Sequence, residues 1–389
     1  MKVLVPLIFL PHAAPDIGTT TTGNQGSARR LGIGFALLSV LLAPYVGAQT
    51  HLTITDVTVI DATGAAPRIV DAEVRGGRVA AIGQLEPSGV RVDGSGKFLI
   101  PGLWDMHVHW SALDDGYDAS AFLPVFIANG VTGIRIMWGM PEHYEWRKRD
   151  DLTRPRMVIG SAIIDGANPV WPGSRIAIDG VGGRQLVREY RDLGADFIKV
   201  YTRLTPDAYY GIADEAHRLG ISMAGHVPHA IRIEEAAQAG HASVEHLSKV
   251  GVALSSERTA IEELASNGAS GTELGDRIIE SHDPKRASAL YDLLRDKGVW
   301  QCPTLTVSRN VAYWRVNRAG DDERARHFPR ALTASWSRWA NVPQPAREGI
   351  RRQLEFSKEV VGAMHRAGVR ILAGTDVMNP SCFPGFSLH

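Results

Sequence analysis

The chain has 389 residues, of which 44% are hydrophobic and 22% are charged. This composition excludes a disordered, collagen-like or coiled-coil chain. At roughly 100–200 residues per domain, the length predicts two or three domains, or one large barrel with an appendage. Lysine plus arginine and aspartate plus glutamate both number 42, so the formal net charge is zero. No basic run is long enough to neutralise several phosphates, and we expect no nucleic-acid partner.

The two cysteines, Cys302 and Cys382, are too few for a disulfide framework or for a zinc site built from cysteines. The sequence leaves two alternatives open for them. They form one disulfide, or they are two unpaired thiols, one on a strand and one in a loop.

Residues 29–48 have the order of a secretory signal peptide. Two arginines are followed by the apolar run 31–42, and Val46-Gly47-Ala48 is typical of a cleavage site. The apolar run is shorter than the ~20 residues of a membrane span, so an uncleaved anchor is the less favoured alternative. We therefore expect residues 1–48 to be a signal peptide with an upstream extension. The mature protein would be exported, periplasmic or secreted, and would not associate with the membrane after cleavage.

Residues 49–100 predict short strands and hairpins. Alternating apolar runs at 52–60, 70–75, 78–83 and 90–92 are separated by glycines, a pattern typical of hairpins. We expect these residues to form a small β-rich part of their own.

Residues 101–389 follow a different pattern, in which strand-like apolar runs alternate with helical stretches. Eight such runs predict an α/β fold, a parallel (β/α)8 barrel of the TIM type, which usually takes about 250 residues. The expected strands are 103–107, 131–137, 157–163, 197–201, 222–226, 243–246, 300–306 and 370–375.

Histidines and two other ionisable residues follow these predicted strands. His107 and His109 end the first strand, where alternation of side chains points both imidazoles to one side. The fourth strand carries Lys199 between apolar neighbours, and the fifth, sixth and eighth strands end at His226, His246 and Asp376. Active sites of this barrel lie at the carboxyl ends of the strands, so the six residues predict a site for two metal ions. Taken singly, each could instead be a strand-end residue hydrogen-bonded to a neighbouring loop.

The same segments resemble the amidohydrolase superfamily, in the branch of imidazolonepropionase, Xaa-Pro dipeptidases and ochratoxinase-like enzymes. The resemblance covers about residues 50–389. It rests on Pro101-Gly-Leu-Trp-Asp-Met-His-Val-His109, Ile198-Lys-Val-Tyr201, Gly225-His-Val-Pro228, Val244-Glu-His-Leu247 and Ala373-Gly-Thr-Asp376, in the family's order. It implies that His107, His109 and Asp376 bind one metal and that His226 and His246 bind the other. Lys199, carbamylated by carbon dioxide, would bridge both.

The resemblance implies hydrolysis of C–N bonds by a hydroxide shared between two divalent ions. Imidazole and carboxylate-type oxygens suit Zn²⁺, our choice, while Mn²⁺, Co²⁺ and Fe²⁺ remain alternatives. Asp376 would take the proton of the attacking water and return it to the leaving nitrogen. Desolvation in an apolar strand lowers the pKa of Lys199, which favours the neutral amine that carbamylation requires. Lys199 also argues against the mononuclear deaminase branch, which lacks that lysine.

The resemblance further implies that the strands of residues 49–100 are the first half of a small β-sandwich whose second half follows the barrel. The sequence ends 13 residues after Asp376, before that half and before a last barrel helix. We therefore expect a C-terminally truncated chain, with a barrel incomplete at its C-terminus and all six metal positions retained.

Other residues near the predicted strand ends carry weaker signals. Tyr201 and His229 are candidates for contacting substrate, and the loop of residues 160–183, which contains Trp171, either covers the site or is an ordinary irregular loop. Four further histidines lie in helical or connecting segments and are expected to be solvated: His217, His241, His282 and His365.

Three functions compete. The leading one is an exported two-metal hydrolase of amide, peptide or cyclic amide bonds, acting on a small molecule or a dipeptide of the Xaa-Pro type. The second is an inactive truncated fragment, and the third is an esterase or lactonase that uses the same metal site. Whether the chain forms a homo-oligomer is left open.

Overall fold

The computed structural model describes residues 51–109, 119–313, 322–330, 336, 342–379 and 381–389, together with the backbone of residues 7–10. The chain divides into two compact units, Met1–Gly102 and Leu103–His389. Apart from residues 7–10, the predicted signal peptide and its upstream extension lie outside the described residues. Among the described helices, none is long and apolar enough to cross a membrane.

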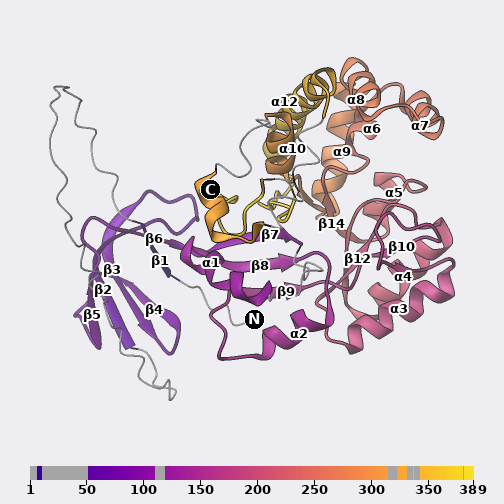
Figure 1. Cartoon of the computed structure of the whole chain (residues 1–389). Coiled ribbons are helices and arrows are strands. Elements are labelled where there is room, and N and C mark those ends of the chain that lie inside the picture. The colour runs from indigo at the N-terminus through magenta and orange to yellow at the C-terminus, as the bar shows by residue number, and fades with distance from the viewer. Residues whose placement is uncertain are drawn as a thin grey trace, which may run out of the picture. The chain divides into compact units, whose positions relative to one another are not determined.

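The N-terminal unit is a β-sheet (Figure 1). Its central strand, β2, pairs antiparallel with β3 and parallel with β5 and β6. The strands are β1 (Leu7–Leu10), β2 (His51–Val59), β3 (Arg68–Arg75), β4 (Arg78–Gly83), β5 (Val90–Asp93) and β6 (Phe98–Pro101). An irregularity of β2 between Ile54 and Val57, where Asp56 has a positive φ (56°), brings Ile54, Val57 and Val59 into one small core with Ala72 and Leu99.

The second unit contains a parallel barrel, as the eight apolar runs predicted. Seven of its strands are β7 (Leu103–Val108), β8 (Val131–Ile136), β9 (Arg156–Ile159), β12 (Phe197–Val200), β13 (Ser222–Gly225), β14 (His241–Glu245) and β15 (Trp300–Cys302). The eighth position is an irregular segment, bridged to β15 at Gln301–Ile371 and to β7 at Val108–Val377. A third bridge, Gly160–Phe197, joins β9 to β12 and closes the circle. Two further short strands, β10 (Ile164–Asp165) and β11 (Arg175–Ile176), extend the sheet beside β12.

Two of the predicted strand ends are wrong. Residues 303–306 are not strand, because Thr304 adopts a left-handed conformation (φ 49°) and a helix begins at Leu305. Residues 160–163 do not continue β9 as a regular strand, since β9 ends at Ile159. Residues 160–163 are buried without being a regular strand, and residues 303–304 are buried in the turn that leads to α10.

Helices follow the strands and cover the barrel. They are α1 (Leu123–Ala128), α2 (Pro141–Lys148), α3 (Gly180–Asp192), α4 (Pro206–Leu219), α5 (Ile233–Gln238), α6 (Val250–Leu254), α7 (Arg258–Ser266), α8 (Gly271–Glu280), α9 (Pro284–Asp296), α10 (Leu305–Ala312) and α12 (Gln344–Arg366). Two 3-10 helices span Ala119–Phe122 and Glu323–His327. Three consecutive helices, α6, α7 and α8, intervene between β14 and α9 (Figure 1).

Side-chain alternation divides the barrel strands into an outer and an inner set. Ile198 and Val200 of β12 belong to the large apolar core that includes the surrounding helices. Phe197 of the same strand instead packs with Met137 and Ala224 in a separate, small cluster. Lys199 has the same parity as Phe197, so β12 directs a lysine into the barrel interior.

The last described residues, 381–389, pack against the rest of the second unit. Cys382 and Phe383 are fully buried, and the His389 ring Nε2 hydrogen-bonds the Asn129 carbonyl oxygen at 2.7 Å. Both cysteines are buried and unpaired, Cys302 on β15 and Cys382 in a loop. Of the two alternatives that the sequence left open, the structure has the free thiols.

Candidate active site

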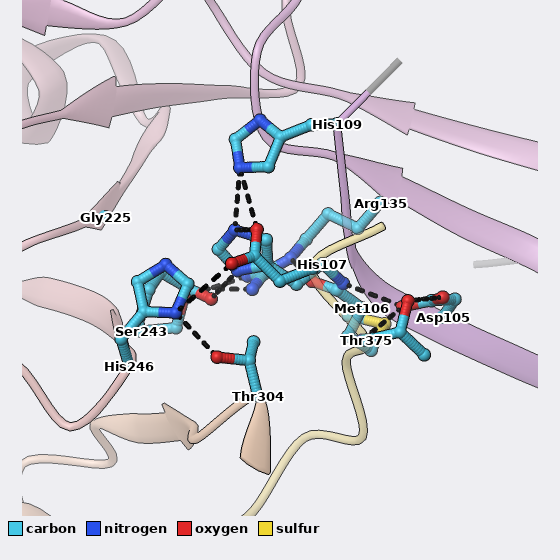
Figure 2. Close-up of polar contacts among 12 residues, drawn as sticks. Asp105, Met106, His107, His109, Arg135, Gly225, Ser243, His246, Thr304 and Thr375 are labelled. Carbon is cyan, nitrogen blue, oxygen red and sulfur yellow. Dashed lines mark hydrogen bonds and ion pairs between the residues drawn. The ribbon is translucent and has the colours of Figure 1, made fainter. Parts of the chain in front are cut away.

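Three of the predicted metal ligands meet at the carboxyl end of β7. The Nε2 atoms of His107 and His109 are 3.1 Å apart, and they lie 3.3 and 3.1 Å from Asp376 Oδ1. Figure 2 shows the rings of His107, His109 and His246 converging on this place. Two ligands held tetrahedrally at the 2.0–2.1 Å of a zinc bond lie about 3.3 Å apart, so this spacing fits a shared ion.

His226 and His246 follow β13 and β14, two adjacent strands elsewhere in the barrel. The ring centroids of His246 and His107 are 4.6 Å apart, and those of His246 and His226 are 4.9 Å apart. His246 Nδ1 lies 3.8 Å from Asp376 Oδ2. Because His246 follows the inward-facing Glu245, strict alternation would turn it outward. A left-handed backbone (φ 57°) breaks the alternation at that residue, and Asp376 has the same conformation (φ 56°).

Lys199 is completely buried, and its Nζ has no hydrogen-bond partner among the described residues. Burial lowers the pKa of Lys199 to about 8, against the opposing charge of Glu245. His226 Nε2 is likewise buried without a described partner. Orphaned buried polar atoms are costly, so two of them in one place indicate a group that they would bind.

Three imidazoles of the site, the buried His107 and the partly exposed His226 and His246, are each held at Nδ1 by another side chain. His107 Nδ1 lies 2.7 Å from Glu245 Oε2, His226 Nδ1 lies 3.0 Å from Thr202 Oγ1, and His246 Nδ1 lies 2.6 Å from Thr304 Oγ1. Such contacts fix the ring orientation and leave Nε2 for a metal. Burial lowers the pKa of His107 to about 3 and that of His226 well below its usual value, so both rings are neutral at pH 7, as ligands must be.

A buried ionic network supports His107 from inside the barrel. Arg135 donates to Glu245 Oε1 and to Ser243 Oγ, each at 2.8 Å, and to the Met106 carbonyl at 2.6 Å. Ser243 Oγ donates to Glu245 Oε1 at 2.7 Å. Sequence reasoning missed this network, and it missed Thr202 and Thr304, which contact the Nδ1 atoms of His226 and His246. The signal for Arg135 was a charge inside the otherwise apolar run 131–137, and for Glu245 it was a carboxylate beside a candidate ligand.

Asp105 positions the irregular segment that carries Asp376. Its carboxylate accepts hydrogen bonds from the Thr375 backbone N–H at 3.0 Å and from Thr375 Oγ1 at 2.5 Å, and the Asp376 N–H donates to the His107 carbonyl at 2.8 Å. Burial raises the pKa of Asp105 to about 6. Burial would raise the pKa of Asp376 too, but the interactions with the neighbouring imidazoles of His246, His107 and His109 outweigh burial and hold that pKa below its usual value.

Two clusters among the described residues have metal-ligand spacing. One is His107, His246 and Asp376, and the other is His107, Glu245 and Cys302. In the second cluster, Glu245 already binds His107, and burial raises the pKa of the Cys302 thiol well above its usual value. Only the thiolate form of cysteine binds a metal, and Cys302 is protonated. The first cluster is therefore the candidate metal centre.

Tyr201 and His229, the predicted substrate contacts, lie beside His226. The Tyr201 ring stacks on His226 with centroids 4.0 Å apart, and its hydroxyl accepts a hydrogen bond from Trp171 Nε1 at 2.8 Å. The loop of residues 160–183 therefore reaches Tyr201. His229 is exposed and lines a cleft of about 640 Å³ that begins at His226 and Thr202.

One of the histidines expected to be solvated is not. His241 opens β14 and is buried, with its Nδ1 3.1 Å from the Tyr209 hydroxyl. The prediction placed His241 in a connecting segment, but the strand begins at His241, two residues earlier than expected.

Gly225, immediately before His226, lies where a side chain has no room. Its φ is 138°, and a Cβ there would come 2.1 Å from the Val200 carbonyl oxygen. We expect Gly225→Ala to lower the free energy of unfolding by about 2–4 kcal/mol, because strain and a backbone clash add. Gly298→Ala is the matched control, since Gly298 also has a positive φ (68°) but has open space around it, and it should cost about 1 kcal/mol. Urea unfolding of both variants tests this, and equal losses would contradict it.

No protein-family model matches the sequence. The chain is 36% identical over 105 residues to N-acetylglucosamine-6-phosphate deacetylase of Lysinibacillus sphaericus, and the match covers 25% of this chain and 27% of that enzyme. The chain thus aligns with about a quarter of the length of this curated relative.

Solved structures share the architecture over most of the chain. A bottromycin amidohydrolase superposes with a TM-score of 0.69 at 24% identity, covering 88% of this chain and 72% of its own. This chain has the amidohydrolase fold. A Xaa-Pro dipeptidase with bound methionine matches with a TM-score of 0.57 at 17% identity (86% and 81% covered). The A. niger ochratoxinase matches with a TM-score of 0.57 at 18% identity, covering 87% of this chain and 77% of its own. The fold implied by the resemblance is confirmed.

Proposed function

We propose that this amidohydrolase-fold protein is a metal-dependent hydrolase of C–N bonds with two divalent ions, zinc by preference. The observation that carries the proposal is the convergence of His107, His109, His246 and Asp376 near the strand ends, beside the buried atoms Lys199 Nζ and His226 Nε2, which have no described hydrogen-bond partner. These residues fit the ions: His107, His109 and Asp376 would hold one, and His226 and His246 the other. Lys199, carbamylated, would bridge them.

Bound ions of this kind polarise a substrate carbonyl and lower the pKa of a coordinated water towards neutrality. The residues of the chain do the rest. Asp376, whose carboxylate is ionised at neutral pH, accepts a proton from the attacking water and gives it to the leaving nitrogen as the C–N bond breaks. Tyr201 accepts from Trp171 and keeps its own proton, because burial raises its pKa, so it can donate to the substrate carbonyl oxygen.

The substrate is a small molecule with an amide, peptide or cyclic amide bond, and dipeptides of the Xaa-Pro type are one candidate class. The structural similarity to a Xaa-Pro dipeptidase supports this class. The order of charges and apolar residues at 29–48 supports export by a signal peptide.

The first test is the metal content of the purified protein, measured by elemental mass spectrometry after incubation with zinc and bicarbonate. We expect about two ions per chain, and His226→Ala should lose at least one. His217→Ala is the matched control, because His217 is an exposed histidine of α4 and should change nothing.

Amine release from Xaa-Pro dipeptides, N-acyl amino acids and cyclic amides then tests the reaction. Loaded protein that hydrolyses none of them, or a chain that binds no ion, would overturn the proposal.

A further inference from the structure

A cleft leads away from the candidate metal centre between the loops after β13 and β14 and the helices α7 and α8. Its lining includes His226 and Thr202. A hydrogen bond from the Val227 N–H to Ser248 Oγ at 2.9 Å ties the two loops together. Because His226 belongs both to the candidate metal centre and to this lining, a substrate bound at His226 would extend into the cleft.

The walls of this cleft are mainly aliphatic. They include Val227, Ile231, Val252, Ile261, Ala265, Leu274 and Ile278. Such walls favour an apolar group, which gains roughly 25 cal/mol per Å² of apolar surface removed from water. Besides His226, the ionisable lining residues are His229, Arg232, Lys249 and Glu262.

Lys249 is the notable charge in this lining. Its side chain is only 15% exposed, although it lies three residues after His246 on a loop. Its Nζ is 3.8 Å from Glu262 Oε1, beyond hydrogen-bond distance, and Glu262 is 35% exposed. Nearby Arg258 has a close partner, with its Nη2 2.6 Å from Glu234 Oε1. Lys249 is thus a largely buried cation whose ion pair with Glu262 is long, and burial lowers the pKa of Lys249 below the usual value.

Lys249 also adopts a left-handed backbone (φ 64°) at the residue before α6. Such a conformation is costly for a residue with a side chain and persists where the surroundings enforce it. It keeps the lysine in the lining of the 640 Å³ cleft and of a smaller neighbouring hollow of about 210 Å³ beside His246.

We infer that Lys249 is a specificity-determining residue: it pairs with an anionic group of an amide substrate whose apolar part fills the cleft. The inference rests on the proposed function only for the position of the bond that is cleaved; binding of the anionic group by Lys249 does not depend on it. A carboxylate and a phosphate would both present an oxyanion to Lys249, and we take the anionic group to be a carboxylate next to an apolar group. An N-acyl amino acid with an aliphatic side chain has this form.

Equilibrium binding to the metal-free protein tests the inference without any turnover. The probes are N-acetyl-L-leucine and N-acetyl-L-leucinamide, which differ only in the anionic group, with methyl phosphate as a probe for a phosphate source. We expect the acid to bind roughly tenfold or more tightly than the amide, because a hydrogen bond to a charged group is being compared with one to a neutral group. Preference for methyl phosphate over both would overturn the carboxylate assignment.

Variants then locate the effect. Lys249→Met should abolish the preference for the acid, and Lys249→Arg should retain most of it. Arg258→Met is the matched control, because it removes an equal charge from a paired residue nearby and should leave the preference unchanged. Equal binding of acid and amide by the unsubstituted protein, or equal effects of Lys249→Met and Arg258→Met, would refute the inference.

Hydrolysis by zinc-loaded protein separates this inference from the proposed function. If acid and amide probes are cleaved with equal kcat/KM, the hydrolase proposal stands and the role of Lys249 fails. If Lys249-dependent binding is found but no substrate is cleaved, the binding site stands and the hydrolase proposal fails.

Discussion

Lys199→Met is expected to reduce kcat/KM at least 10³-fold and to remove one or both bound ions. Methionine fills the space of the lysine but offers no nitrogen that carbon dioxide can modify. The matched control is Lys297→Met, which removes an exposed lysine just after α9 and should leave activity and metal content unchanged. Metal content and rates measured on the two variants decide the point. A Lys199→Met protein that keeps two ions and full activity would exclude a bridging role.

In the metal-free protein, the same substitution is expected to raise the free energy of unfolding. Burial lowers the pKa of Lys199 from 10.5 to about 8. Below pH 8 the amine is protonated in both states, and the buried charge destabilises the folded state relative to the unfolded chain. The shift corresponds to about 3 kcal/mol of destabilisation at pH 7, which disappears as the pH rises from about 8 to above 10.5. Lys199→Met should therefore be more stable than the unsubstituted metal-free protein at pH 7, and the difference should narrow by pH 10. Urea unfolding at the two pH values measures it. A Lys199→Met protein that is less stable at pH 7 would show that the amine is stabilised in place.

The six predicted ligands lie in one place because their positions depend on features that a sequence displays. Buried parallel strands appear as apolar runs, and their carboxyl ends share one rim, so His107 and His226 could be placed without knowledge of loop conformations. Strand limits are less visible in a sequence. The mixed run at 300–306 ends as a strand at Cys302, and no change of pattern separates it from the left-handed Thr304 and the start of α10.

What sequence reasoning did not find is set by contacts between distant residues. Arg135 and Glu245 are 110 positions apart, and their pairing follows from the closure of the barrel. Thr202 and Thr304 carry no pattern that distinguishes them from ordinary strand-end threonines. The cleft lined by Lys249 is built from two loops and two helices of the region between β13 and α9, whose packing no local pattern specifies.

Arg135→Met is expected to lower the free energy of unfolding by about 3–5 kcal/mol, because it leaves the carboxylate of Glu245 buried without its cation. Glu245 has no exposed side-chain surface, so solvent does not screen the loss. Arg188→Met is the matched control: Arg188 pairs with Glu215 at 2.6 Å, but its side chain is 54% exposed and Arg218 pairs with the same carboxylate. That control should cost no more than about 1 kcal/mol.

The pH dependence distinguishes a stranded charge from lost packing. Burial raises the pKa of Glu245, but the charge of Arg135 and the hydrogen bond with His107 outweigh it and hold the pKa well below its usual value. A carboxyl with a depressed pKa contributes stability above the pKa of the unfolded chain, and this contribution is lost as the pH falls. Without Arg135, Glu245 can take a proton, so the penalty of Arg135→Met should be largest at pH 7 and should shrink towards pH 4. Adding Glu245→Gln should then recover part of the loss at pH 7, with a coupling free energy of about 0.5–3 kcal/mol. A penalty that is constant with pH, with no recovery in the double variant, would mean that Arg135 acts by packing on Phe197 rather than by its charge.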